Sequence, residues 1–167
     1  MNRVVGNDSS NTTQIFRLQG FFMIANLSIK ILIVDDDEDF LEVVANDVER
    51  ILGIRPNLAA NAKEALEHIQ NHSTHFLITD TNMPEMNGVD LLIKAKDHSP
   101  SLKVIMLFSG LNGSNIDAKE ILRLGAYMVL SKAEVRSRLY PFLRAYAIGQ
   151  AIWHYMNMIF PTDKFRG

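Results

Sequence analysis

Short apolar runs that alternate with segments of helical periodicity are the feature that most restricts the fold of this chain. Three runs, at residues 29–34, 75–79 and 103–108, are apolar throughout much of their length, as is typical of strands buried on both faces. Strands that alternate with helices need right-handed crossovers, which favours a parallel sheet with both faces covered. The sequence therefore predicts an α/β fold with a five-stranded, doubly wound parallel sheet. We expect strands at residues 29–34, 54–59, 75–79, 103–108 and 127–130, and helices at 40–52, 62–70, 88–95 and 116–124.

Length and composition favour a single domain with extensions at both ends. The 167 residues include no cysteine, which excludes disulfides, thiolate nucleophiles and zinc sites built on sulfur. Residues 1–131 carry 11 basic and 17 acidic side chains, whereas residues 132–167 carry 6 basic and 2 acidic ones. An electrostatic footprint for nucleic acid over the whole chain is thus not expected. We expect a flexible N-terminal extension at residues 1–27, the domain at 28–140, and an apolar C-terminal helical extension at 141–167.

Polar residues follow four of the predicted strands, at the carboxyl ends where doubly wound sheets carry their functional groups. Asp35 and Asp36 follow the first strand and Asp80 the third, while Ser109 and Lys132 follow the fourth and fifth. Three clustered carboxylates repel one another unless a cation is present, and an oxygen-rich site suits Mg²⁺. With a lysine and a hydroxyl available for phosphoryl oxygens, one carboxylate can act as a nucleophile. The residues predict a Mg²⁺-dependent aspartyl-phosphate site.

Four motifs in this order resemble the receiver domain of two-component response regulators, of the single-domain, CheY-like type. The motifs are Ile31-Leu32-Ile33-Val34-Asp35-Asp36-Asp37, then residues 77–88 around Asp80, then Val104-Ile105-Met106-Leu107-Phe108-Ser109-Gly110, and finally Gly125-Ala126 with Lys132. The resemblance covers about residues 28–140. It implies a flavodoxin-like fold, continued here by an extended C-terminal helix.

The resemblance also implies a role for each residue of the site. Asp80 would accept a phosphoryl group from a sensor histidine kinase or a histidine phosphotransfer protein. Lys132 would neutralise phosphoryl charge, and Ser109 would act as a switch that turns toward the phosphate. Mg²⁺ would be held by Asp35, Asp36, Asp80 and the backbone carbonyl of Asn82.

Two positions depart from the family pattern. Ala133 follows the lysine, where the family usually has a proline after a cis bond, so we expect a trans bond and a shifted loop. Val129 stands where the family has an aromatic switch residue. Tyr127 lies two residues earlier and, by strand alternation, on the same side, so it would be a weak substitute.

The C-terminal segment carries more apolar side chains than a last receiver helix needs to bury. Phe142, Tyr146, Trp153 and Met156 are the candidate interaction surface. Three explanations stay open: folding back over the domain, for example against Phe21 and Phe22; a homodimer or partner surface; and, least favoured, contact with a membrane surface. A membrane span is not expected, because Arg144, Gln150, His154 and Asn157 interrupt the apolar stretch.

Three functions follow from these residues. The favoured one is a stand-alone, cytoplasmic receiver that catalyses only its own phosphorylation and dephosphorylation and alters binding to an unknown downstream protein. Too few residues follow the predicted domain for a DNA-binding domain. A pseudo-receiver scaffold with impaired switching is the first alternative, suggested by Val129 and Ala133. The second alternative is a small phosphohydrolase of the haloacid-dehalogenase type, which would use the pair Asp35-x-Asp37.

Overall fold

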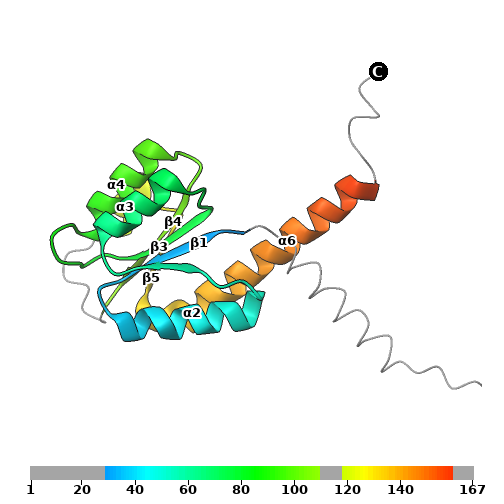
Figure 1. Cartoon of the computed structure of the whole chain (residues 1–167), viewed down its shortest axis with the longest axis horizontal. Helices are drawn as coiled ribbons and strands as arrows, with labels where there is room; N and C mark the ends of the chain where they lie inside the picture. Colours follow the sequence, from blue (N-terminus) through cyan, green and yellow to red (C-terminus); the bar gives the residue numbers. More distant parts are fainter. Residues whose placement is uncertain (1–28, 110–117, 160–167) are drawn as a thin grey trace, which may run out of the picture.

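The computed structural model describes residues 29–109 and 118–159, with side chains described up to residue 156. Five parallel strands form one sheet in the order β2-β1-β3-β4-β5, which confirms the predicted fold class (Figure 1). The strands are β1 (Ile31–Val34), β2 (Asn57–Ala59), β3 (Phe76–Asp80), β4 (Lys103–Phe108) and β5 (Met128–Ser131). The helices are α2 (Glu38–Leu52), α3 (Ala62–Asn71), α4 (Gly88–His98), α5 (Ala118–Arg123) and α6 (Tyr140–Ile159). A 3₁₀ turn, η1 (Lys132–Glu134), and one π-helical turn, η2 (Val135–Leu139), join β5 to α6.

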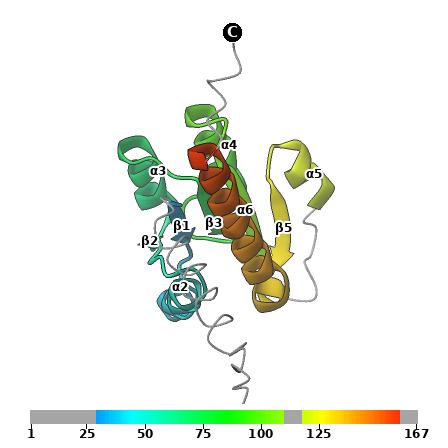
Figure 2. The ribbon, with the colours of Figure 1, turned by 90° about the vertical axis from the view of Figure 1, so that its right-hand side faces the viewer.

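Helices cover both faces of the sheet, as its buried strands require. One apolar cluster joins the sheet to α2 and α6, and a second joins it to α3, α4 and α5. Figures 1 and 2 show α2 and α6 on one face and α3 and α4 on the other. Successive residues of one strand enter opposite clusters, as strand geometry requires: Ile31 and Ile33 pack toward α2, whereas Leu32 and Val34 pack toward α3.

The order of the strands reverses between β1 and β3. From β1 the chain passes to β2 on one side and then returns to β3 on the other. In the parallel pairing of β1 with β3, Val34 lies opposite Thr79, so the residues that come next, Asp35 and Asp80, are neighbours at the carboxyl edge of the sheet. This edge, at the switch point, is where doubly wound sheets carry their ligands.

The observed strands differ from the predicted ones mainly at their ends. β2 begins at Asn57 rather than at residue 54, because Pro56 has no N–H to donate to a ladder. β5 is shifted by one residue, since Tyr127 precedes its first residue, Met128. α5 is described from Ala118, and the earlier part of the helix predicted at 116–124 lies outside the described residues. The extension predicted at residues 1–27, with Phe21 and Phe22, lies outside them as well.

Side chains and glycines define where the helices begin and end. Asp37 caps α2 by accepting a hydrogen bond from the backbone N–H of Phe40 at 3.0 Å, and Asn87 caps α4 through the N–H of Asp90 at 2.9 Å. Gly53 ends α2 in the left-handed conformation, with φ of 68°. Asp35 and Asp36 thus lie between the end of the buried strand β1 and Asp37, the N-cap of α2.

Helix α6 packs on the sheet with its first half and extends beyond it with its second. Leu143, Ala147 and Ala151 are buried. The extension predicted at residues 141–167 therefore begins within α6, whose first half packs against the domain. Further along, Ile152 and Trp153 are more than half exposed where α6 extends past the sheet (Figure 1). No helix among the described residues is both long enough and apolar enough to span a bilayer.

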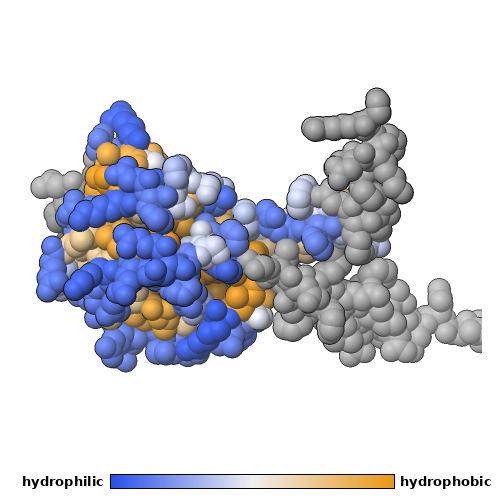
Figure 3. Space-filling model, turned by 45° about the horizontal axis from the view of Figure 1, so that its top comes forward, coloured by the Kyte–Doolittle hydropathy of each residue, from blue (hydrophilic) through white to orange (hydrophobic). Residues whose placement is uncertain are grey.

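The surface of the domain follows the usual separation of polar from apolar side chains. In the view of Figure 3, hydrophilic residues cover most of the visible surface of the domain, and hydrophobic ones show between them. Buried charge is accordingly rare: among the described residues, only two acidic or basic side chains, those of Asp35 and Asp80, are buried. Such groups need a functional or structural reason.

Candidate functional site

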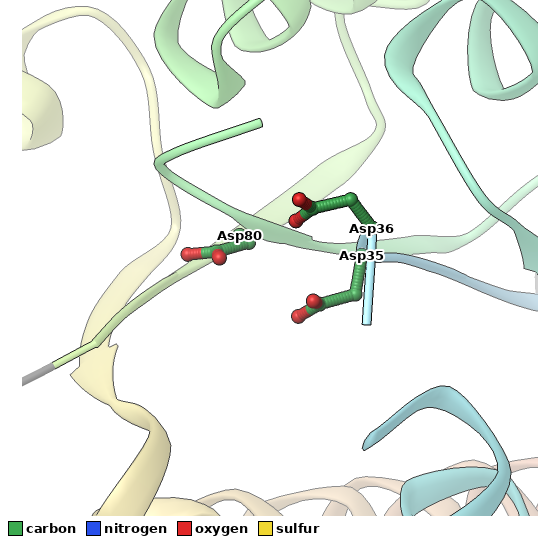
Figure 4. A group of neighbouring side chains, drawn as sticks. All are labelled: Asp35, Asp36 and Asp80. Carbon is green, nitrogen blue, oxygen red and sulfur yellow. The ribbon is translucent and has the colours of Figure 1, made fainter. Parts of the chain in front are cut away.

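Three carboxylates meet at the switch point of the sheet. Asp35 and Asp36 directly follow β1, and Asp80 is the last residue of β3. Each offers an oxygen that lies within 4.8 Å of the others, and Figure 4 shows the three side chains projecting into the same space. Asp35 and Asp80 are 1% and 4% exposed, whereas Asp36 faces solvent. The structure thus brings together the three acids that the sequence predicts to converge.

Lys132 joins the two buried acids. Its Nζ lies 2.7 Å from Oδ2 of Asp35 and 3.1 Å from Oδ2 of Asp80. The same ammonium lies 4.5 Å from the centroid of the Phe40 ring, a favourable cation–π distance. Lys132 comes from the loop after β5, so residues from three segments of the chain meet at this point.

The charges of the site are only partly balanced. Burial raises the pKa of Asp35 above its ordinary value, although the hydrogen bonds from Lys132 and from the backbone N–H of Asp37 act in the opposite direction. Burial tends to lower the pKa of Lys132, but its hydrogen bonds to Asp35 and Asp80 outweigh that effect and raise it. One ammonium faces three carboxylates, which leaves the site with negative charge for a cation to neutralise.

One oxygen of Asp80 is left open. Oδ2 of Asp80 contacts Lys132, but Oδ1 is buried without a hydrogen-bond partner in the described part of the chain. A buried carboxylate oxygen without a partner is costly unless a ligand completes it. The open oxygen, together with the oxygen donors of Asp35 and Asp36, fits a hard divalent ion such as Mg²⁺.

Backbone hydrogen bonds hold the loop that follows Asp80 at the end of β3. The backbone N–H of Thr81 donates to the carbonyl of Leu107 at 2.8 Å, and that of Gly88 donates to the carbonyl of Thr81 at 3.0 Å. Asn82, whose backbone carbonyl is the fourth predicted metal ligand, is exposed in this loop. The hydroxyl of Thr81 is buried and has no partner among the described residues.

The remaining predicted residues lie around this centre, with one correction. Ser109 is exposed immediately after β4, and Val129 packs on the α3–α4 side of the sheet. Tyr127 was expected on the side of Val129, but its ring lies 5.5 Å from that of Phe142 in α6, which packs on the opposite face. That prediction is wrong because Tyr127 precedes β5 and does not follow its pleat.

The predicted interaction surface divides into two parts. Phe142 and Tyr146 are half-buried, and their rings pack edge-on against Phe76 of β3, at 5.9 and 4.8 Å between centroids. These two residues therefore belong largely to the core, because α6 uses its first half to cover the sheet. Trp153 and Met156 lie on the exposed second half of α6, at 65% and 49% exposure.

Two contributions to the site were not anticipated. Phe40 forms the apolar support beneath the ammonium of Lys132. Ser131 and Glu134 form a capping box around Lys132, and the spacing Ser-x-x-Glu is a sequence signal that could have revealed it. The bond before Ala133 is trans, as expected, because the described residues contain no cis peptide.

Comparison with known proteins agrees with the fold. The family model described as the response regulator receiver domain matches residues 31–144. Chemotaxis protein CheY1 of Helicobacter pylori is 34% identical over 99 residues, which are 58% of this chain and 79% of that protein. The crystal structure of a response regulator receiver domain protein (CheY-like) from Methanospirillum hungatei has a TM-score of 0.63 and 26% identity, covering 75% of this chain and 98% of the other.

Other relatives are longer proteins. The uncharacterized transcriptional regulatory protein YesN of Bacillus subtilis is 38% identical over 105 residues, but these make up only 28% of its length. The fold and the site define a class of protein: a doubly wound signalling domain with an acidic, lysine-bridged centre at the switch point. The chain belongs to the response regulator receiver domain family of two-component systems.

Proposed function

We propose that Asp80 is the phosphoacceptor of a phosphorelay and receives its phosphoryl group from the phosphohistidine of a sensor kinase or a phosphotransfer protein. The observation that carries the proposal is the arrangement at the switch point. Asp80 is 4% exposed, one of its oxygens is held by Lys132, and the other has no partner among the described residues. It lies beside two further acids that supply oxygen ligands.

The reaction transfers one phosphoryl group between two side chains. A carboxylate oxygen of Asp80 attacks phosphorus, a P–O bond forms, and the P–N bond to the donor imidazole breaks. The electron pair of the broken P–N bond stays on the imidazole nitrogen, which takes up a proton from solvent water. Lys132 neutralises charge on the phosphoryl oxygens, and Ser109, which follows β4, is the proposed hydrogen-bond donor that reports the modified state.

Mg²⁺ is the proposed cofactor. The proposed ligands are the carboxylates of Asp35, Asp36 and Asp80 with the backbone carbonyl of Asn82. When bound, the ion supplies positive charge that screens the acids from one another and from the incoming phosphoryl group. The role of Lys132 is then to orient Asp80 through its contact with Oδ2.

Phosphorylation by acetyl phosphate tests this proposal directly. With Mg²⁺ present, the intact mass of the wild-type chain should rise by one phosphoryl group per chain. Asp80→Asn should take up none, while Asp97→Asn, which changes an exposed acid of α4, should behave as wild type. Removal of Mg²⁺ with a chelator should also abolish labelling. A wild-type chain that stays unlabelled with Mg²⁺ would contradict the proposal and favour the pseudo-receiver scaffold, which is supported by Val129 at the aromatic position.

The phosphohydrolase alternative finds less support in the site. It needs Asp37 as the second acid of the pair Asp35-x-Asp37. Asp37 is instead exposed, and its Oδ1 accepts the hydrogen bond that caps α2. A carboxylate engaged in this way is poorly placed to act as a general acid toward a phosphate ester.

We propose further that the output of the modified domain is binding. Phosphorylation would shift the population of two conformations and so change the affinity for a downstream protein. A second copy of the chain is the proposed partner of the exposed part of α6, because Ile148, Ile152 and Tyr155 recur there at the spacing of a coiled-coil seam and are 40%, 55% and 46% exposed. A cytoplasmic location and the absence of catalysis beyond self-phosphorylation stay predictions.

A further inference from the structure

The loop that presents Lys132 is held by a single acidic side chain. Glu134 Oε2 accepts hydrogen bonds from the backbone N–H and from the hydroxyl of Ser131, each at 2.9 Å. Lys132 lies between these two residues, inside the 3₁₀ turn Lys132–Glu134. The carboxylate therefore closes the turn around the lysine and fixes the residue from which its side chain starts.

The other oxygen of Glu134 connects the turn to the segment that follows. Oε1 accepts a hydrogen bond from Nη1 of Arg138 at 2.8 Å, and the backbone carbonyl of Glu134 accepts one from the hydroxyl of Ser137 at 3.3 Å. Both partners belong to the π-helical turn that leads into α6. Glu134 thus ties the end of β5 to the beginning of the last helix.

The position of this backbone matters because Lys132 must reach two acids at once. Its Nζ contacts Asp35 and Asp80 at 2.7 and 3.1 Å, and only 20% of the Lys132 side chain is exposed. A lysine side chain has many rotamers, and ordering it costs conformational entropy. A fixed backbone at Lys132 reduces the conformational entropy that ordering its side chain costs. The residue that follows, Ala133, does not restrict the backbone of the loop by itself.

We propose that Glu134 is a positioning residue for Lys132, holding its loop so that the ammonium meets Asp80 and the phosphoryl group. The inference rests on the proposed phosphoacceptor function. The hydrogen bonds of Glu134 are with Ser131, Ser137 and Arg138, not with the three acids, so its effect on the site must pass through Lys132.

The rate of phosphorylation and the affinity for Mg²⁺ should respond differently to loss of Glu134. In Glu134→Ala, we expect phosphorylation by acetyl phosphate to slow about tenfold, as for other residues that orient a site from outside it. Mg²⁺ affinity, measured by calorimetry, should stay at the wild-type value or tighten, since the three acids remain. Glu134→Gln should recover most of the rate because its amide oxygen can still accept from Ser131. Equal losses of rate and Mg²⁺ affinity in Glu134→Ala, which would indicate a general distortion, would overturn the inference.

A double-mutant cycle identifies the residue through which Glu134 acts. In the Lys132→Ala background, Glu134→Ala should cause no further loss of rate, because the group that it positions is already gone. Arg138→Ala is the matched control, since it removes the outer ion pair of Glu134 but leaves both bonds to Ser131. Losses that simply multiply in the double variant would contradict positioning through Lys132.

A readout in the resting protein separates this inference from the proposed function. If the wild-type chain takes up no phosphoryl group, the function proposed above fails, but the Nζ resonance of Lys132 can still be followed by NMR. We expect a protected Lys132 ammonium signal in wild type and Arg138→Ala, and its loss by fast exchange in Glu134→Ala with the amide spectrum of the fold otherwise kept. An unchanged ammonium signal in Glu134→Ala would refute the inference.

Discussion

At the scale of single residues, the site depends on the close approach of the start of α4 to the backbone of Asp80. Gly88, the first residue of α4, lies so near the end of β3 that a Cβ built on it would stand 2.0 Å from the backbone carbonyl oxygen of Asp80. No Cβ fits at that distance, so the closeness of the Asp80 carbonyl, rather than an unusual backbone conformation, requires a glycine at this position. The helix that follows the loop can therefore pack directly against the residue that carries the chemistry.

Replacing Gly88 by alanine should be costly. The clash is with backbone, which cannot rotate away, so β3 or α4 must shift, and we expect Gly88→Ala to lower the free energy of unfolding by about 1–3 kcal/mol. Urea denaturation followed by circular dichroism measures this change. Gly149→Ala is the matched control, because nothing lies within 4 Å of a Cβ at that position of α6. The control should raise stability by about 0.5–1 kcal/mol, as alanine does in place of an exposed helical glycine. Equal stability of Gly88→Ala and wild type would contradict the close approach.

The site acids could be predicted from sequence, whereas the details around them could not. Asp35 and Asp80 were found because each follows an apolar run whose burial is evident from its composition, and parallel strands bring their carboxyl ends to one edge. The position of Tyr127 was wrong because alternation holds only within a strand, and β5 begins one residue later. The packing of Phe40 beneath Lys132 depends on tertiary geometry that local periodicity does not contain.

At the scale of elements, the junction between β5 and α6 is organised by charge. The carboxylate of Glu134 accepts hydrogen bonds from Arg138 and from the backbone and side chain of Ser131, and these contacts lower its pKa to about 2 from an ordinary value of 4.5. Asp47 of α2 approaches the same region, with Oδ2 at 3.5 Å from Nε of Arg136. Burial, followed by the charge of Asp47, raises the pKa of the Tyr140 hydroxyl above its ordinary range. The last helix is thus joined to its surroundings by polar contacts as well as by its apolar face.

The titration of Glu134 should report the capping box. Because its pKa is lower in the folded state than in the unfolded state, the stabilisation that it gives is complete above pH 4.5 and is lost as the pH falls toward about 2. Carbon-detected NMR of the side-chain carboxyl should give a midpoint well below 4.5 in wild type and an upward shift in Arg138→Ala. A wild-type midpoint at the ordinary value would show that the box is not formed in solution.

At the scale of the whole molecule, α6 has two apolar faces with different uses. Leu143, Ala147 and Ala151 bind it to the domain, while Ile148 and Ile152 face solvent on another side. The sequence showed an excess of apolar residues in this segment but could not separate the two sets. The sequence predicts Phe142 and Tyr146 on the outer surface, because helical periodicity alone does not show which face of α6 meets the sheet. Their edge-on contacts with Phe76 place them against the core instead.

Self-association through α6 should be measurable and easily disrupted. We expect the wild-type chain to show a concentration-dependent monomer–dimer equilibrium in sedimentation experiments. Ile152→Glu should shift that equilibrium toward monomer by about tenfold or more, because a charge would be buried in the seam. Ile93→Glu, which alters an exposed apolar residue of α4, should leave it unchanged. A wild-type chain that stays monomeric at every concentration, or equal behaviour of both variants, would contradict a second copy as the partner of α6.

The chain contains one tryptophan, Trp153, and 65% of that side chain is in contact with solvent near the far end of α6. Its indole emission is consequently an intrinsic optical probe, free of background from any other indole in the molecule. A binding event that covers this end of the helix would shift the fluorescence toward the blue and protect it from soluble quenchers. Screening of candidate partners therefore requires no dye, tag or substitution.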